Sequence, residues 1–270
     1  ILHGSKKIKS KALLLKALIK TLFNLNLYII YYKEMQFNKK DKILIIAAHP
    51  DDEVLGCGGT ISSLSSKGID IRILFLSEGV SSRFDNNQKN LKKLNNEIKL
   101  RNNNSIKALK ILGVNKKNIF FENYPCCKLD TIPRLNLVKV IEKHISIFKP
   151  SIIFTHFMDD VNIDHKITFE SVLAATRPYN NRSIESIYLF EVLSSTEWNF
   201  VSPFPANCFF DISETIKKKI SAMKAYKKEY KSHPHPRSSR VIEALATYRG
   251  AQVGINFAEG YFLLRTKNSN

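Results

Sequence analysis

The sequence has few of the residues on which small secreted proteins and fibrous proteins depend. Among 270 residues there are 4 cysteines, 10 glycines, 9 prolines and 1 tryptophan. Cys126 and Cys127 are adjacent, and no C-x-x-C pair occurs, so neither a disulfide framework nor a cysteine-based zinc site is expected. This cysteine usage fits a reducing cytoplasm. The composition also excludes a collagen-like, coiled-coil or broadly disordered chain.

The sequence also lacks a hydrophobic run long enough to cross a membrane near its start. The longest uncharged stretch there, 21–32, has twelve residues, whereas a spanning helix needs about 20. Lys16, Lys20 and Asn24 recur at four-residue spacing, which predicts an amphipathic helix with one polar stripe. Residues 1–34 are therefore interpreted as a basic extension, either docked on the domain or in peripheral contact with a membrane, or as a segment outside the functional unit. The functional domain is predicted to be residues 35–270.

Acidic residues are scarce relative to basic ones. The chain has 42 Lys and Arg against 24 Asp and Glu, a formal net charge of +18, and most of the basic residues are lysine. One interpretation is a lysine-rich solvated surface, and the other is a surface for nucleic acid or an anionic membrane. No nucleic-acid-binding motif occurs, and the aromatic residues are not interleaved with basic ones in one patch. Nucleic acid is therefore not expected as a partner.

From residue 42 onward, short apolar runs alternate with helix-compatible segments. Strands are predicted at 43–47, 69–76, 119–121, 152–155, 187–191 and 261–264, and helices at 60–67, 86–112, 135–148, 167–176, 212–230 and 239–248. This alternation predicts an α/β fold, a Rossmann-like three-layer sandwich with a mostly parallel central sheet. In such a sheet, ligands bind at the carboxyl ends of the strands.

Metal-ligand and acid–base side chains follow two of the predicted strands. His49, Asp51 and Asp52 follow the first strand, and His165 closes the polar segment after the fourth. Because His49 and Asp52 lie three residues apart on a tight turn, both can reach one ion. His165 would complete a His/Asp/His set with a fourth position open for water. Asp51 would point differently and be free to act as a base.

Each motif alone has a simpler interpretation. The His-Pro-Asp-Asp run could be a helix N-terminus with acidic caps, and the Asp-His pair could be an ion pair. Their occurrence on two strand ends of one sheet favours a metal site. Glu53 is expected to interact with a helix start rather than with the metal. The glycines that follow are expected to let the backbone approach a ligand closely: Gly56, Gly58 and Gly59.

Two stretches carry a resemblance to a known family. Residues 47–59, AAHPDDEVLGCGG, resemble the signature of the PIG-L/LmbE-like deacetylases, and residues 162–165, NIDH, resemble their second motif. The resemblance extends from about residue 41 to 265. Supporting stretches lie at 191–198, 235–238, 249–250 and 258–259. Members of this family are zinc-dependent amidases that remove acetyl groups from N-acetylglucosamine-type sugars on lipids, inositols, antibiotics and other glycans.

The resemblance implies roles for individual residues. It implies Zn²⁺ on His49, Asp52 and His165, with Asp51 as the general base. It also implies that Asn162 donates to the oxyanion, although members with His there have a stronger donor, and that Asp164 orients His165. In the position of the usual Arg-x-x-Glu this chain has Arg101-Asn102-Asn103-Asn104, without the acid.

Several further residues are candidates for substrate contact. Arg83 and Asp130 fall in loops that meet the sugar in the family, or they are a surface arginine and a helix-entry acid. Arg237 either binds a substrate phosphate or pins its loop, and His156 is a candidate for lining the site. The remaining histidines are interpreted as structural or surface residues: His3, His144, His233 and His235.

The function implied by the resemblance is a zinc-dependent amidohydrolase. Its substrate would be an N-acetylated sugar, lipid-linked or nucleotide-linked, in bacterial surface-glycan or glycoconjugate biosynthesis. The expected location is cytoplasmic, with peripheral contact at the inner face of the membrane as an alternative. The competing hypothesis is a non-catalytic sugar- or nucleotide-binding module on the same fold.

Overall fold

The structure is a computed structural model that describes residues 37–84, 91–179, 181 and 183–267. The chain divides into two units between residues 36 and 37, and the fold described here is that of the second unit. The extension predicted for residues 1–34 lies outside the described residues.

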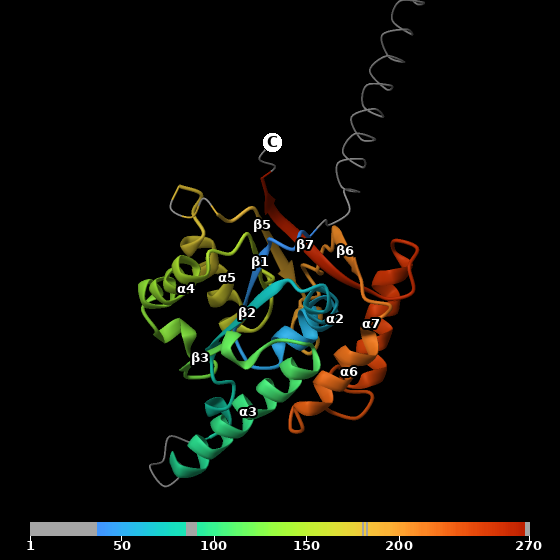
Figure 1. Cartoon of the computed structure of the whole chain (residues 1–270). Coiled ribbons are helices and arrows are strands. Elements are labelled where there is room, and N and C mark those ends of the chain that lie inside the picture. Colours follow the sequence, from blue (N-terminus) through green and yellow to red (C-terminus); the bar gives the residue numbers. More distant parts are fainter. Residues whose placement is uncertain (1–36, 85–90, 180, 182, 268–270) are drawn as a thin grey trace, which may run out of the picture. The chain divides into compact units, whose positions relative to one another are not determined.

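Strands and helices alternate along the chain, as the apolar runs predict (Figure 1). In chain order the elements are β1 (Lys42–Ala47), α2 (Asp52–Ser66), β2 (Asp70–Ser77), η1 (Ser81–Arg83), α3 (Leu91–Ile111), η3 (Lys116–Asn118), β3 (Ile119–Tyr124), η4 (Leu129–Thr131), α4 (Arg134–Phe148), β4 (Ile152–His156), α5 (Ile163–Ala175), β5 (Ser186–Phe190), η5 (Thr196–Trp198), β6 (Cys208–Asp211), α6 (Ile216–Ala225), α7 (Ser239–Ala251) and β7 (Ala258–Thr266).

The described strands form one seven-stranded sheet in the order β3-β2-β1-β4-β5-β7-β6. The pairs from β3 to β5 are parallel, and β7 runs antiparallel to both β5 and β6. The predicted mostly parallel three-layer fold is therefore confirmed. Strand β6 is not among the predicted strands, because this edge strand is four residues long and has no continuous buried apolar run.

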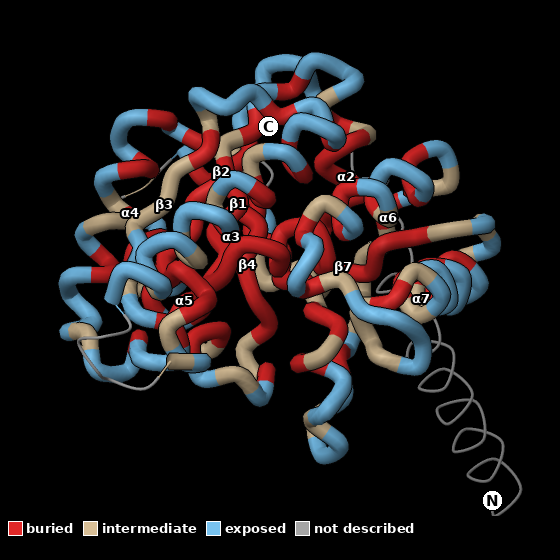
Figure 2. The backbone as a smooth tube through the Cα atoms, turned by 90° about the horizontal axis from the view of Figure 1, so that it is seen from below, coloured by how far each residue is buried: buried red, intermediate tan, exposed pale blue. Residues whose placement is uncertain are grey.

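Figure 2 shows that the central strands are buried, and the buried residues of these strands are mostly apolar. In β1 all five residues from Ile43 to Ala47 are buried. Leu44 and Ile46 belong to one core cluster with Leu137 and Ile141 of α4. Helices α4 and α5 cover that face, and α2, α3, α6 and α7 lie on the other side (Figure 1). Polar chemistry is consequently confined to the ends of the strands.

Helix α2 begins eight residues before the predicted position. It starts at Asp52 rather than Thr60. The helix is kinked at Cys57, whose backbone dihedral angles are not helical. The prediction that the glycines of α2 let the backbone approach a ligand closely was wrong. A Cβ on Gly59 would lie 2.5 Å from the Ile212 side chain, and one on Gly56 would overlap Phe190. The glycines therefore allow close packing of α2 against the protein, not against a ligand.

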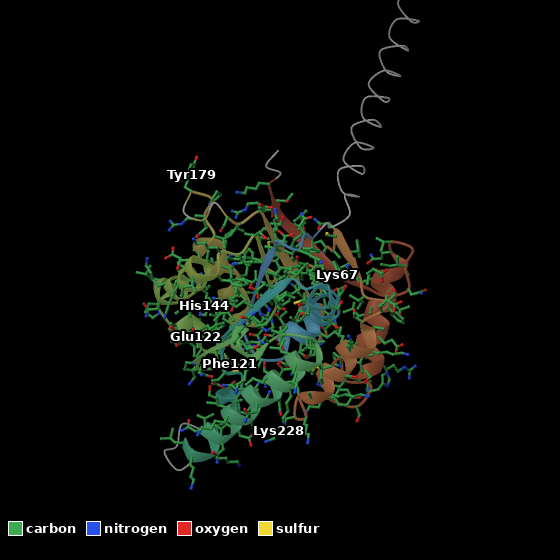
Figure 3. All side chains as sticks on the ribbon, in the orientation of Figure 1. Lys67, Phe121, Glu122, His144, Tyr179 and Lys228 are labelled. Atoms are coloured by element: carbon green, nitrogen blue, oxygen red, sulfur yellow. The ribbon has the colours of Figure 1, made fainter. Side chains whose placement is uncertain are left out.

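The ring of His144 packs against an aromatic side chain and lies close to one acidic side chain. Its ring lies edge-on to Phe120 with 4.8 Å between ring centroids, and its Nε2 lies 3.4 Å from Glu122 Oε1. This agrees with its interpretation as a structural residue. Figure 3 labels His144 and Glu122. Among the described helices, none combines the length and the apolar character needed to cross a membrane.

Candidate metal centre

The site forms where β1 and β4 end side by side in the sheet. The turn after β1 carries His49 and leads into α2, whose first residue is Asp52. The loop after β4 leads into α5, whose first turn carries His165. Asn162 caps this helix, since its Oδ1 accepts a hydrogen bond 2.9 Å long from the backbone N–H of Asp164. The cap fixes where α5 begins and hence where His165 projects.

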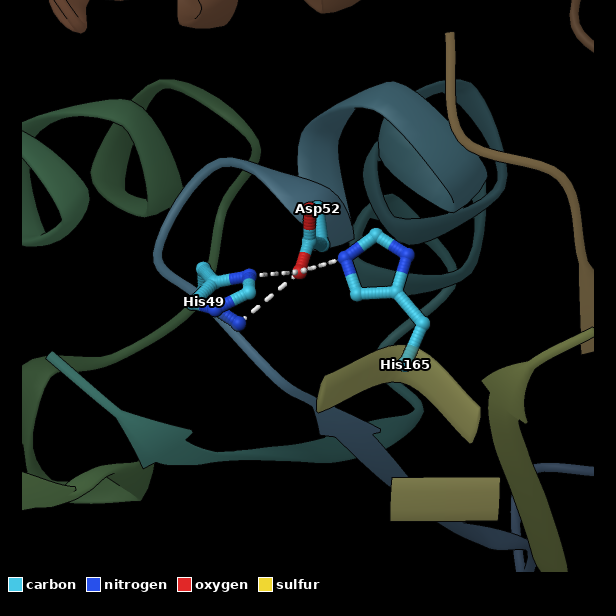
Figure 4. Close-up of side chains that lie close together, drawn as sticks. All are labelled: His49, Asp52 and His165. Atoms are coloured by element: carbon cyan, nitrogen blue, oxygen red, sulfur yellow. Dashed lines mark hydrogen bonds and ion pairs between the residues drawn. The ribbon is translucent and has the colours of Figure 1, made fainter. Parts of the chain in front are cut away.

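Three side chains converge on one point (Figure 4). Asp52 Oδ2 lies 3.3 Å from His49 Nδ1 and 3.3 Å from His165 Nε2. Their ligand atoms all lie within 4.8 Å of one another, and all three residues are buried. The structure thus brings together the three residues predicted as metal ligands. A second group that could hold an ion shares His49 and adds Cys126 and Asp164.

The three candidate ligand atoms are of the types that bind a zinc ion. Among the described residues, His165 Nε2 is a buried polar atom without a hydrogen-bond partner, although it faces Asp52 Oδ2. Two imidazole nitrogens and one carboxylate oxygen are the ligand types of catalytic zinc, and such a set leaves a fourth position open.

The charges around His165 favour a cation. Burial alone would lower the pKa of His165, but Asp52 and Asp160 raise it to about 9. Burial would likewise raise the pKa of Asp52, but His165 and His49 hold it well below its usual range. The same two carboxylates that stabilise an imidazolium would stabilise a divalent ion at this point.

The carboxylates that orient the two histidine rings differ from the prediction. His165 Nδ1 lies 3.1 Å from Asp160 Oδ2, so Asp160 orients this ring. Asp164, which was expected to orient His165, instead lies 2.9 Å from His49 Nε2. The reason is geometric, because Asp164 precedes His165 on α5 and neighbouring helical side chains do not face each other.

The carboxylates of Asp160 and Asp164 are held in place by hydrogen bonds of their own. Asp160 accepts hydrogen bonds from the hydroxyls of Ser195 and Thr196, the second at 2.6 Å. Asp164 accepts backbone hydrogen bonds from Cys127 at 2.6 Å and Leu129 at 3.0 Å. The loops after β3 and β5 therefore fix the two acids that orient the two histidines.

Asp51 is held in an unusual conformation beside this group. Its φ is 123°, in a region that residues with a side chain rarely adopt, and its side chain is buried. Arg101 Nη2 donates to Oδ1 at 2.8 Å, and Arg237 Nη1 donates to Oδ2 at 2.9 Å. Burial raises the pKa of Asp51, and the two arginines act against that rise. Asp51 and Asp52 therefore have different partners, because Asp52 Oδ2 lies against His49 and His165.

Glu229 ties the arginines together. Its Oε1 accepts from Arg83 at 2.8 Å and from Arg101 at 2.5 Å, and its Oε2 accepts from Arg83 at 3.0 Å and from Arg237 at 2.7 Å. Burial would raise the pKa of Glu229, but the arginines lower it to about 2. The result is a network of two buried carboxylates and three guanidinium groups, of which Arg101 is buried and Arg83 is half exposed.

The residues predicted to contact substrate have different positions. His156, the last residue of β4, is fully buried; its ring stacks on His165 with 3.9 Å between centroids, and its Nε2 accepts from the backbone N–H of Ala48. Asp130 is exposed, and its side chain makes no hydrogen bond or ion pair with the described residues. His156 therefore packs against one of the three candidate ligands, and Asp130 is not brought into the site.

Arg83 and Arg237 differ in exposure and in their contacts. Arg83 is half exposed and pairs with Glu229. Arg237 binds Asp51 and Glu229, and its Nε also donates to Ser194 Oγ at 2.6 Å. Of the two interpretations of Arg237, the contacts favour the one in which it pins its loop.

Three functional residues had weak or no signals in the sequence. Asp160 was adjacent to the second motif and could have been found as an acid near His165. Arg101 was noted, but without its contact to Asp51, to which it is joined by a buried ion pair 2.8 Å long. Glu229 lies in a lysine-rich stretch with no motif around it. Glu53 does bind at the start of α2, as expected, because its Oε2 accepts from the backbone N–H of Asp51 at 2.9 Å.

Comparison with known proteins identifies the class to which this fold and site belong. The family model described as PIG-L, GlcNAc-PI de-N-acetylase, matches residues 44–176, and the chain belongs to the PIG-L family. The matched range includes both motifs and all three candidate ligands.

Individual relatives are similar over much of the chain. The diacetylchitobiose deacetylase of Thermococcus kodakarensis is 28% identical over 235 residues, which cover 83% of each protein. The uncharacterized deacetylase YaiS of Escherichia coli is 30% identical over 148 residues, 52% of this chain and 70% of that one. The structure of N,N'-diacetylchitobiose deacetylase from Pyrococcus horikoshii has a TM-score of 0.65 at 21% identity, covering 91% of this chain and 92% of that one, and so shares the fold. Both of these curated relatives are named as deacetylases.

Proposed function

We propose that this chain is a zinc-dependent hydrolase that removes the acetyl group from an N-acetylated sugar. The observation that carries the proposal is the buried His49, Asp52 and His165 group with Asp51 held beside it. Relatives named as deacetylases of diacetylchitobiose support an N-acetylglucosamine-type substrate. More specifically, we propose that the substrate is a lipid-linked or nucleotide-linked sugar conjugate in bacterial surface-glycan biosynthesis.

Zinc would be held by His49 Nδ1, Asp52 Oδ2 and His165 Nε2. When bound, it supplies Lewis-acid polarisation of the acetamide carbonyl and makes water a better nucleophile at neutral pH. Asp160 holds the His165 ring and Asp164 holds the His49 ring, so both imidazoles keep their orientation without the substrate.

Asp51 moves the protons. A carboxylate has about four lone-pair sites, and Arg101 and Arg237 each occupy one, so each oxygen retains acceptor capacity. Asp51 takes a proton from the attacking water and returns it to the departing amine nitrogen. Its fixed backbone and its two arginine partners keep the carboxylate in one place during both transfers.

Asn162 is the proposed donor to the oxyanion. Its Oδ1 is engaged at the start of α5, and its amide NH₂ is the end that can donate to the developing negative charge. An amide carries no positive charge, so this contribution is smaller than that of an imidazolium. Asp164, the third residue proposed as catalytic, acts through the orientation of His49.

The substrate side of the proposal rests on charge. Arg83 is the half-exposed member of the arginine cluster and is suited to an anionic group on the sugar conjugate. The four cysteines are free thiols, which supports a cytoplasmic location. Against a non-catalytic binding module stands the buried Asp51, because binding alone does not require a strained carboxylate beside a metal group.

Two matched variants test the proposal. Asp51→Asn should keep zinc, measured by mass spectrometry of the purified protein, and lose roughly 10²–10⁴-fold of acetate release from N-acetylglucosamine conjugates. Asp52→Asn should lower zinc content first. If Asp51→Asn lost the metal and Asp52→Asn retained it, the two roles would be reversed. If both variants kept zinc and full acetate release, the hydrolase assignment would be wrong.

A further inference from the structure

Large apolar side chains are exposed where the loops after β4 and β5 meet. Their exposed fractions are 88% for Phe200 and 95% for Val201, and between 41% and 49% for Val161, Ile163 and Trp198. These five residues are called the apolar rim below. Exposed apolar side chains that occur singly are ordinary, whereas a contiguous group of this size often marks an interaction surface.

Specific contacts join the two segments of the rim. Asn199 Nδ2 donates to the backbone carbonyl of Asp159 at 2.8 Å, and Ser202 Oγ donates to Asp159 Oδ2 at 2.9 Å. Beneath them the rings of Phe157 and Phe204 pack edge to face, with 5.0 Å between centroids. The two segments therefore present one surface.

The tip of the rim has a defined turn. Asn199 Oδ1 accepts hydrogen bonds from the backbone N–H groups of Val201 at 3.2 Å and Ser202 at 3.0 Å. An asparagine side chain that bonds to the backbone two residues on stabilises a turn. This turn presents Phe200 and Val201 to solvent while the backbone N–H groups of Val201 and Ser202 remain paired.

The rim borders the candidate metal centre. Val161 and Ile163 flank Asn162, the cap of the helix that carries His165. Trp198 ends η5, which begins at Thr196, a residue whose hydroxyl donates to Asp160. The apolar rim therefore lies on the same two loops that hold residues of the candidate metal centre.

We propose that the apolar rim inserts into the interfacial region of an anionic lipid bilayer. The exposed apolar area of the five side chains is on the order of 500 Å², within the range of the apolar patches that act as interaction sites on monomeric proteins. Projecting phenylalanine and tryptophan side chains suit the boundary between headgroups and acyl chains.

The charges near the rim are compatible with an anionic surface. The carboxylate of Glu197 is occupied by the backbone N–H groups of Ser194 and Ser195, at 2.6 and 3.0 Å. Arg237 contacts Ser194 from the neighbouring loop, and the carboxylate of Asp159, the acid between the two rim segments, accepts from the Ser202 hydroxyl at 2.9 Å. The formal net charge of the chain is +18, which attracts it to anionic lipid.

Trp198 makes the test direct, because it is the only tryptophan in the chain. The full chain is mixed with vesicles of phosphatidylcholine and phosphatidylglycerol, or of phosphatidylcholine alone. On the mixed vesicles, Trp198 emission should shift to shorter wavelength and be quenched by brominated acyl chains. The signal comes from the rim itself, so binding through residues 1–34 alone cannot reproduce it.

Variants separate the rim from other apolar surface. Phe200→Ser combined with Val201→Ser should reduce vesicle partitioning and Trp198 quenching by roughly tenfold or more. Ile147→Ser is the matched control: Ile147 is 65% exposed, at the end of α4 that precedes β4, and so lies at the opposite edge of the sheet. This control should partition like the wild type.

Three results would overturn the proposal. The first is vesicle binding with unchanged Trp198 emission, which would assign the contact to another surface. The second is absence of binding to the anionic vesicles. The third is a concentration-dependent blue shift without vesicles, which would assign the rim to a second copy of the chain. None of these readouts depends on deacetylase activity.

Discussion

Replacing Glu229 by Gln should destabilise the fold through the arginine network. The Glu229 side chain is 6% exposed and contacts three arginines, two of which also bind Asp51. The substitution keeps the size of the side chain but removes its charge. Three guanidinium groups would then face the single carboxylate of Asp51.

The magnitude follows from the lowered pKa of Glu229. Burial works to raise this pKa, but the hydrogen bond and charge of Arg83 and the charges of Arg101 and Arg237 lower it from 4.5 to about 2. At about 1.4 kcal/mol per pKa unit, this corresponds to about 3 kcal/mol of folding free energy. Removing one partner of a buried ion pair costs about 3–5 kcal/mol, which agrees in size.

The effect depends on pH with a defined sign. Because the folded-state pKa of Glu229 lies below its unfolded value, its contribution is fully present above about pH 4.5 and is lost as the pH falls through about 2. The difference in unfolding free energy between wild type and Glu229→Gln should therefore be about 3 kcal/mol near pH 7 and about 1 kcal/mol near pH 3. Urea denaturation followed by far-ultraviolet circular dichroism measures both values.

A surface ion pair supplies the control. Glu97 lies 2.5 Å from Lys228 Nζ, and these side chains are 22% and 56% exposed. Glu97→Gln should therefore change the unfolding free energy by less than about 1 kcal/mol. A Glu229→Gln effect as small as this control, or equal at both pH values, would refute the argument from the buried network.

Three further outcomes are expected. Asp160→Asn should weaken zinc affinity by roughly 10–100-fold, measured by chelator competition, because His165 loses its charged partner; unchanged affinity would contradict that role. Gly59→Ala should lower the free energy of unfolding by roughly 1–3 kcal/mol, since its new Cβ would lie 2.5 Å from Ile212, and calorimetry that finds no loss would show that Ile212 can move away. Treatment with a chelator should lower the melting temperature and added zinc should restore it, because bound metal stabilises the folded state; a melting temperature indifferent to both would count against a metal centre.

The sequence was sufficient for the fold class and for the central histidines and carboxylates. Continuous apolar runs identify buried parallel strands, and His49, Asp52 and His165 stand at the ends of two of them. These signals are local, because periodicity and motif spacing span only a few residues. The topology of a parallel sheet then brings the strand ends to one edge.

The tertiary structure alone decided which groups pair. Arg101 and Glu229 are 128 positions apart, and nothing near either residue indicates the other. On α5 the sequence placed Asp164 beside His165, yet the helix turns its carboxylate to His49 and leaves His165 to Asp160. Similarly, the glycines of α2 have their reason in Phe190 and Ile212 across the core. Such partners are selected by how helices and loops pack in three dimensions, which local sequence patterns do not encode.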